Sequence, residues 1–134
     1  MLLHISPTTL VSDVQREFNN SFPFLKLEFY PFKHSGSNAA IKYPYKRIGD
    51  CQSGIVDGIL DVRPEMKVID LENTLKDKFN LNAQVFRSSG KLWLQTTMTD
   101  QWTLRKQNDH GMELSRHDEL LKPGAKDIDL EDYN

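Results

Sequence analysis

One short segment of the chain combines aromatic and basic residues in a pattern that could bind nucleic acid. It runs Lys42-Tyr43-Pro44-Tyr45-Lys46-Arg47. Tyrosine rings stack on unpaired bases, and basic side chains hold phosphates, as in proteins that bind single strands. The same composition also suits an edge strand that proline and lysine protect from aggregation. Because the formal net charge is −2, the chain has no general attraction to nucleic acid, and this function is the alternative and not the first hypothesis.

A second polar segment, Asp50-Cys51-Gln52-Ser53, lies between two glycines. A cysteine close to Arg47 could have a lowered thiol pKa and act as a nucleophile. No spacing pattern links Cys51 to any of the four histidines, and a lone cysteine is most often a small buried apolar residue. A small ligand-binding or enzymatic domain that uses the Asp50–Ser53 loop is therefore a further alternative, and we assign no catalytic residue.

The two tryptophans are candidates for binding. In the predicted strand 91–96, Leu92 and Leu94 share one face and Trp93 takes the other. If the leucines face the core, Trp93 is either covered by another element, such as the helix that carries Trp102, or forms an interface. The predicted binding residues are Tyr43, Tyr45, Arg47, Trp93 and Trp102.

Metal and cofactor chemistry find no support in the sequence. The histidines have no metal-ligand spacing, and the acids of segment 127–132 do not fit a calcium loop. Neither a Walker pattern nor a dinucleotide fingerprint occurs. We predict no metal and no cofactor. A single cysteine, no signal-peptide pattern at the start and no long apolar stretch lead us to expect a cytoplasmic protein without a membrane span.

The elements that must position these residues come from an internal repeat. Pro7 and Pro64 are equivalent after a shift of 57 residues, and a strand, a helix and a second strand then match without a gap. The apolar positions of the two helices have the same spacing. They are Val11, Val14, Phe18 and Phe22 in the first unit, and Val68, Leu71, Leu75 and Phe79 in the second. The match of Phe29 with Phe86 extends the repeat into the closing strands.

Two such units predict an α+β fold, a two-layer sandwich in the ferredoxin-like order, with both helices on one face of a four-stranded sheet. Residues 31–56 are an inserted loop, and a hairpin strand and a helix follow the second unit. We expect one domain over residues 1–122 and an acidic, flexible tail over 123–134.

Three local features are also predicted. Ser6 caps the first helix with Pro7 at its first position, and Thr97 caps a last helix that carries Trp102 and ends near Asn108, before Gly111. Gln15 and Glu72 are equivalent surface positions that tolerate alanine.

These observations favour a non-enzymatic protein–protein interaction or assembly module. The chain shows no catalytic constellation, whereas a ferredoxin-like sheet offers an open face and free edges on which a protein partner can dock. The expected partner is another protein or further copies of the same chain. With 134 residues, of which 38% are hydrophobic and 27% charged, the chain is long enough to form its own core.

Overall fold

The chain folds into five β-strands and four α-helices within residues 1–30 and 46–120, the part that the computed structural model describes. The strands are β1 (Leu2–Ile5), β2 (Leu25–Tyr30), β3 (Gly58–Asp61), β4 (Asn82–Ser89) and β5 (Leu92–Gln95). The helices are α1 (Val11–Ser21), α2 (Ile48–Cys51), α3 (Val68–Phe79) and α4 (Leu104–Leu120), with a 3-10 turn, η1 (Thr97–Thr99), before α4. The predicted α+β class is confirmed.

The strands form two antiparallel sheets. One sheet pairs β1 with β3, and the other has the order β2-β4-β5. Each strand of the first unit thus pairs with a strand of the second, β1 with β3 and β2 with β4. Because these four strands are divided between two sheets, the predicted ferredoxin-like order in one four-stranded sheet is not confirmed.

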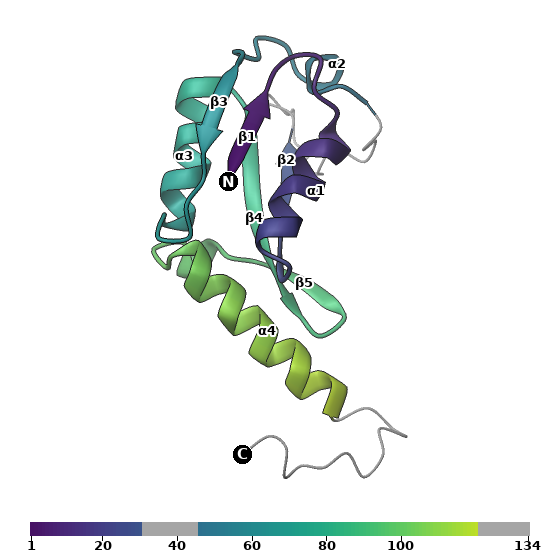
Figure 1. Cartoon of the computed structure of the whole chain (residues 1–134), viewed down its shortest axis with the longest axis vertical. Coiled ribbons are helices and arrows are strands. Elements are labelled where there is room, and N and C mark those ends of the chain that lie inside the picture. The colour runs from purple at the N-terminus through teal and green to yellow at the C-terminus, as the bar shows by residue number, and fades with distance from the viewer. Residues whose placement is uncertain (31–45, 121–134) are drawn as a thin grey trace.

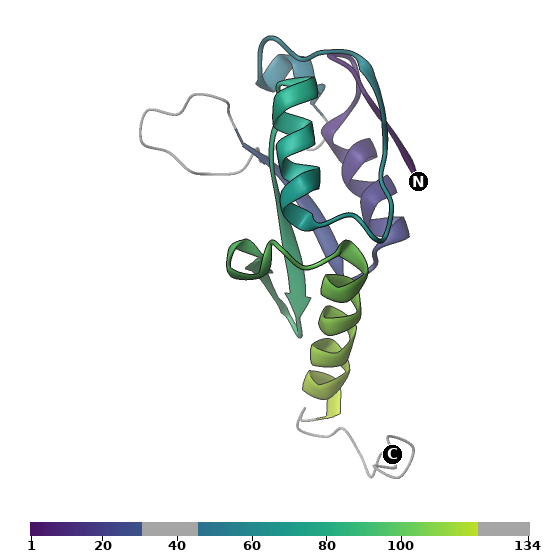
Figure 2. The same ribbon diagram turned by 90° about the vertical axis from the view of Figure 1, so that its left-hand side faces the viewer.

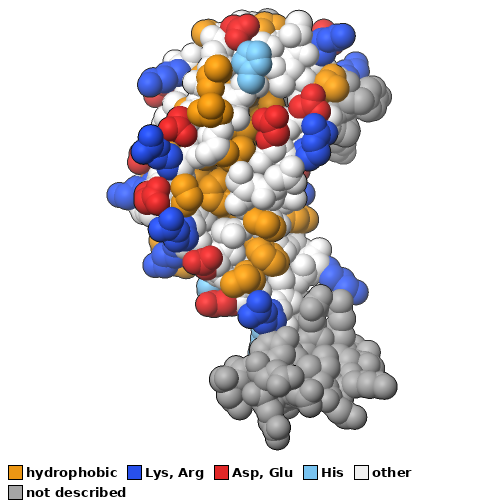
Figure 3. Space-filling model, viewed as in Figure 1, with side chains coloured by type: hydrophobic (Ala, Val, Ile, Leu, Met, Phe, Trp, Pro, Cys, Tyr) orange, Lys and Arg blue, Asp and Glu red, His pale blue; other side chains and the backbone are white. Residues whose placement is uncertain are grey.

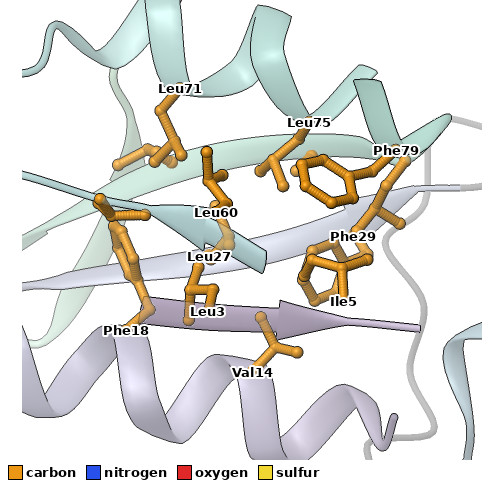
Figure 4. Packing of buried hydrophobic residues seen from close by; sticks show 14 of the residues in the cluster. Leu3, Ile5, Val14, Phe18, Leu27, Phe29, Leu60, Leu71, Leu75 and Phe79 are labelled. Atoms are coloured by element: carbon orange, nitrogen blue, oxygen red, sulfur yellow. The ribbon is translucent and has the colours of Figure 1, made fainter. Parts of the chain in front are cut away.

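The two sheets and two helices enclose the apolar core. In Figures 1 and 2, β1 and β3 lie across the domain from β2 and β4, while α1 and α3 close opposite sides. Figure 4 shows side chains from all of these elements pointing inward, among them Leu3, Leu27, Leu60 and Leu75, which are at most 8% exposed. The arrangement agrees in general form with two layers, although the helices flank the sheets instead of covering one common face.

The shift between the two units changes from 57 to 56 residues after the helices. Pro23 and Phe24 separate the buried residues Phe22 and Leu25, whereas Asn80 alone separates their equivalents Phe79 and Leu81. Asn80 adopts the left-handed conformation, with φ 58° and ψ 35°, which turns the chain within one residue. The buried positions then match as Leu25 with Leu81, Leu27 with Ala83 and Phe29 with Val85. The gapless match of Phe29 with Phe86 is therefore wrong, since Phe29 is buried and Phe86 is only half-buried.

An approximate two-fold axis relates the two units. In the first sheet Leu3 pairs with Leu60, its own equivalent at the shift of 57. In the second sheet Glu28 pairs with Gln84, its own equivalent at the shift of 56. When a residue lies opposite its own equivalent in an antiparallel pair, the two-fold axis passes between them. The strand pairing in each sheet is therefore consistent with a two-fold relation between the units.

The repeat continues into a second helix in each unit, of which the sequence predicted α4 but not α2. The backbone N–H of Ile48, which opens α2, donates to the carbonyl of Thr9 over 2.8 Å. The N–H of Leu104, which opens α4, donates to the carbonyl of Met66, the equivalent of Thr9, over 2.9 Å. Ile48 and Leu104 are both buried. The segment predicted as an inserted loop over 31–56 thus contains α2, the short counterpart of α4.

The predicted helix ends are wrong in three places, namely the start of α1 and both ends of α4. Ser6 accepts a hydrogen bond from the Thr8 N–H in a turn, and α1 begins only at Val11, whose N–H donates to the Lys46 carbonyl. Helix α4 begins at Leu104, capped by the Thr103 hydroxyl, which accepts from the Lys106 N–H. The helix continues through Gly111, where the absence of a side chain lets α4 pack closely against Phe24. A Cβ at this position would lie 3.0 Å from Cβ of Phe24.

The equivalent core residues Phe18 and Leu75 are both fully buried. Replacing either one by alanine should lower the free energy of unfolding by about 2–5 kcal/mol, because each change leaves a cavity in the core. Urea unfolding of the purified variants measures this loss. Glu17→Ala, on the exposed side of α1, is the control and should change stability by less than about 0.5 kcal/mol. Equal stabilities for Phe18→Ala, Leu75→Ala and the control would refute the assigned core.

Candidate functional site

Strand β5 is an apolar edge strand that is exposed along its whole length. All four residues are exposed, and the side chains of Leu92, Trp93 and Leu94 are 65%, 38% and 40% accessible. Met98, in the following turn, is 96% exposed. Edge strands of this kind are templates for pairing with another chain. The prediction that Leu92 and Leu94 face the core is wrong, because β5 extends beyond the elements that enclose the core (Figure 1).

Among the residues that the structure describes, no strand bonds to the backbone groups on the outer edge of β5. The strand pairs with β4 on one side, and within residues 1–30 and 46–120 no strand pairs with its other side. The Thr96 N–H donates to the carbonyl of Val85 over 3.3 Å, so Thr96 faces β4. Since hydrogen-bonded positions alternate along an antiparallel pair, Leu92 and Leu94 also bond to β4. The N–H and C=O groups of Trp93 and Gln95 therefore point outward, away from β4.

Two turns fix β5 in place. At its start, Gly90 and Lys91 form a two-residue hairpin loop in which Gly90 has a positive φ of 63°. At its end, the buried Thr96 hydroxyl donates to the carbonyl of Val85 over 2.9 Å. The N–H of Val85 donates in turn to Oε2 of Glu72 over 2.9 Å. Val85 of β4 therefore holds the end of β5, and Glu72 of α3 holds Val85 in turn. The predicted hairpin is confirmed.

Glu72 and Gln15 are not the surface positions that the sequence predicts. The Gln15 amide donates to the carbonyl of Leu27 over 2.9 Å, so both side chains bond to the backbone of closing strands. Burial, as the largest cause, and the nearby Asp100 carboxylate together raise the pKa of Glu72 to about 7, against the lowering effect of the hydrogen bond from Val85. The pKa of Tyr30 is also raised. Burial is the largest cause, and the carboxylates of Glu28 and Glu72 contribute as well.

Trp93 lies on the face of the sheet opposite the core, with a cation beside it. The ammonium of Lys26 is 4.9 Å from the centre of the Trp93 ring and 5.6 Å from that of Phe86. Lys26 also forms an ion pair with Glu28 at 3.2 Å. This neighbourhood leaves over a third of the Trp93 side chain accessible, which is consistent with the predicted role of Trp93 in an interface.

Trp102 packs inside the chain and does not cover Trp93 as one alternative proposed. It precedes α4 and is half-buried. The Lys106 ammonium lies 4.3 Å from its ring centre, and the ring of His110 meets it edge-on at 5.5 Å. These residues, with Asp109 and Glu113, line an open hollow of about 320 Å³ along α4. The ring of Trp102 therefore packs against side chains from the first two turns of α4.

The remaining predicted residues lie elsewhere. Tyr43 and Tyr45 are outside the described residues. Arg47 is exposed at the start of α2, at the opposite end of the domain from β5 (Figure 1). The structure therefore does not bring Arg47 together with either tryptophan.

The predicted loop around Cys51 is partly helical, since Asp50 and Cys51 lie in α2, and this segment has structural contacts. Burial raises the pKa of the Cys51 thiol, and Asp50 raises it further, against a lowering effect of Lys46. A raised pKa is the opposite of the activation that a nucleophilic thiol needs. Gln52 is buried and its amide donates to the carbonyl of Asn80 over 2.6 Å. In the second unit, the equivalent Asn108 accepts from the N–H of Phe24, so both side chains join units of the repeat.

Exposed apolar residues also lie on β1 and β3. Figure 3 shows apolar side chains along the face that β1 and β3 occupy in Figure 1. Leu2 and its equivalent Ile59 are 65% and 66% exposed there. Within the described ranges, no group of three or more His, Cys, Asp and Glu side chains could hold a metal ion. In the same ranges, no helix has the length and apolar character needed to cross a membrane.

Comparisons with protein-family models, with curated proteins and with solved structures found no match to this chain. The candidate site is therefore defined by exposure and hydrogen bonding alone. Sequence reasoning identified Trp93 in it but missed Leu92, Leu94 and Met98. The signal that could have found them is the position of this hairpin after both units of the repeat, where the next predicted element is a helix and not a further strand.

The raised pKa of Glu72 predicts a pH-dependent stability. The folded chain binds this proton more tightly than the unfolded chain, so the stability it gives is complete below about pH 4.5 and is lost as the pH rises to about 7. Glu72→Gln keeps an oxygen that accepts from Val85 but removes the ionisation. The variant should match the wild type near pH 4.5 and have the higher melting temperature at pH 8. A difference in melting temperature that stays constant from pH 4.5 to pH 8 would contradict this assignment.

Proposed function

We propose that this protein is a non-enzymatic protein-interaction and assembly module that docks a partner along the outer edge of β5. The observation that carries the proposal is the combination, in one strand, of outward backbone groups at Trp93 and Gln95 with exposed apolar side chains. Backbone hydrogen bonds give affinity when a strand is added to a sheet edge, and alternate side chains give specificity. A tryptophan in such a patch is a typical binding hot spot.

Strand β5 lacks the features that protect exposed edge strands in most proteins. Natural proteins usually place charged residues, proline or a covering element at an exposed edge. Here the strand itself, Leu92-Trp93-Leu94-Gln95, contains no charge and no proline. The structure leaves the three apolar side chains accessible at 38–65%. Leaving them in water is unfavourable, and a partner strand would remove both the apolar surface and the free hydrogen-bonding groups from solvent.

The two alternative functions have less support. For nucleic-acid binding through Tyr43, Tyr45, Lys46 and Arg47, both tyrosines lie outside the described residues, and the formal net charge of −2 gives no general attraction to nucleic acid. The thiol of Cys51 has a raised pKa, which disfavours the enzymatic alternative at the Asp50–Ser53 loop.

The test is a capture experiment with a matched pair of variants. Leu92 and Ile59 both lie on strands and are 65% and 66% exposed. The full-length wild type, Leu92→Lys and Ile59→Lys are immobilised and exposed to an extract of cells that express the protein. The wild type and Ile59→Lys should retain the same protein, and Leu92→Lys should lose it. Retention by all three forms alike, or loss only in Ile59→Lys, would contradict docking on β5.

A further inference from the structure

Strand β5 is complementary to itself. An isologous dimer uses the same surface of both subunits around a two-fold axis. Antiparallel pairing of two β5 strands would satisfy this symmetry and join the three-stranded sheets of two copies across one axis. The hairpin that presents β5 lies at the margin of the ribbon in both perpendicular views (Figures 1 and 2).

The hydrogen-bonding pattern limits the register of such a pair. Outward groups must meet outward groups, so Trp93 of one copy can lie opposite either Trp93 or Gln95 of the other. The second choice places Leu92 opposite Thr96, which is 1% exposed and already bonded to Val85. The first choice uses only residues 91–95. It therefore fits the exposed part of the strand.

We infer that the partner of β5 is a second copy of this chain, paired antiparallel with Trp93 of each copy at the two-fold axis. This inference rests on the proposed function. The register places Leu92 opposite Leu94 on one face and the two Trp93 side chains opposite each other on the other face. Cross-strand pairs of aromatic and aliphatic residues stabilise sheets. Each copy thereby covers the apolar side chains that the other exposes.

The charges near the strand are compatible with this pairing. Lys91 is the charged residue next to β5 in the hairpin loop, and the register places it opposite the neutral Gln95 of the second copy and not opposite its own equivalent. Lys26, which lies beside Trp93 on the same face, is neutralised by its ion pair with Glu28. Like charges directly opposite each other, which destabilise sheets, are therefore avoided.

Sedimentation equilibrium of the full chain, from micromolar to millimolar concentration, tests the inference. Two variants affect the interface differently. Leu94→Lys puts a charge into the apolar pair, and Gln95→Pro removes an outward N–H that β4 does not use. The wild type and Ile59→Lys should form a dimer, and each β5 variant should raise the dimer dissociation constant by at least tenfold. Circular dichroism and melting temperatures identify any variant that is unfolded. If one β5 variant is unfolded, the dissociation constant of the other β5 variant decides the test.

Three outcomes would overturn the inference. They are a wild type that stays monomeric at millimolar concentration, a dimer that neither β5 variant weakens, and an assembly larger than a dimer. A monomeric wild type that still captures another protein through Leu92 would refute self-pairing and leave the proposed function intact. A dimer that the β5 variants do not weaken, together with a capture experiment that does not depend on Leu92, would refute both.

Discussion

The pairing of equivalent strands from two β-α-β units is the constraint on which the rest of this structure depends. Leu3 lies opposite Leu60 in one sheet, and Glu28 lies opposite Gln84 in the other. Neither unit can complete either sheet alone, because each supplies one strand to both. The two sheets in turn require α1 and α3 to close the sides of the core. One two-fold relationship therefore determines the sheet order, the placement of the helices and the common core.

Much of the fold could be predicted because side-chain burial follows simple periods. Apolar spacing identified α1, through Val14 and Phe18, and α3, through Leu71 and Leu75. All four residues are buried. The sequence could not reveal how the strands pair, since the same apolar alternation suits one sheet or two. Nor could it reveal α2, because backbone bonds such as that from Ile48 to Thr9 involve no recognisable side chain.

The candidate site was only partly predictable, because residue periodicity assigns side chains to faces but does not show which face is covered. An alternating pattern says that Leu92 and Leu94 share one face, but it does not say whether anything covers that face. Periodicity assigned them to the core, whereas the position of β5 at the end of the sheet leaves them exposed. Trp93 was identified because the same alternation places it on the face opposite Leu92 and Leu94. Trp102 was identified by residue type, and its contacts with Lys106 and His110 show a role in packing.

Amide hydrogen exchange followed by NMR tests the central claim, that the outer edge of β5 is a docking edge, most directly. The N–H groups of Leu92 and Leu94 bond to β4 and should exchange slowly at every protein concentration. Those of Trp93 and Gln95 point outward and should exchange rapidly in dilute solution, then become protected as the concentration rises and copies associate. Rapid exchange of Trp93 and Gln95 at all concentrations, or protection of both in the dilute monomer, would contradict the account.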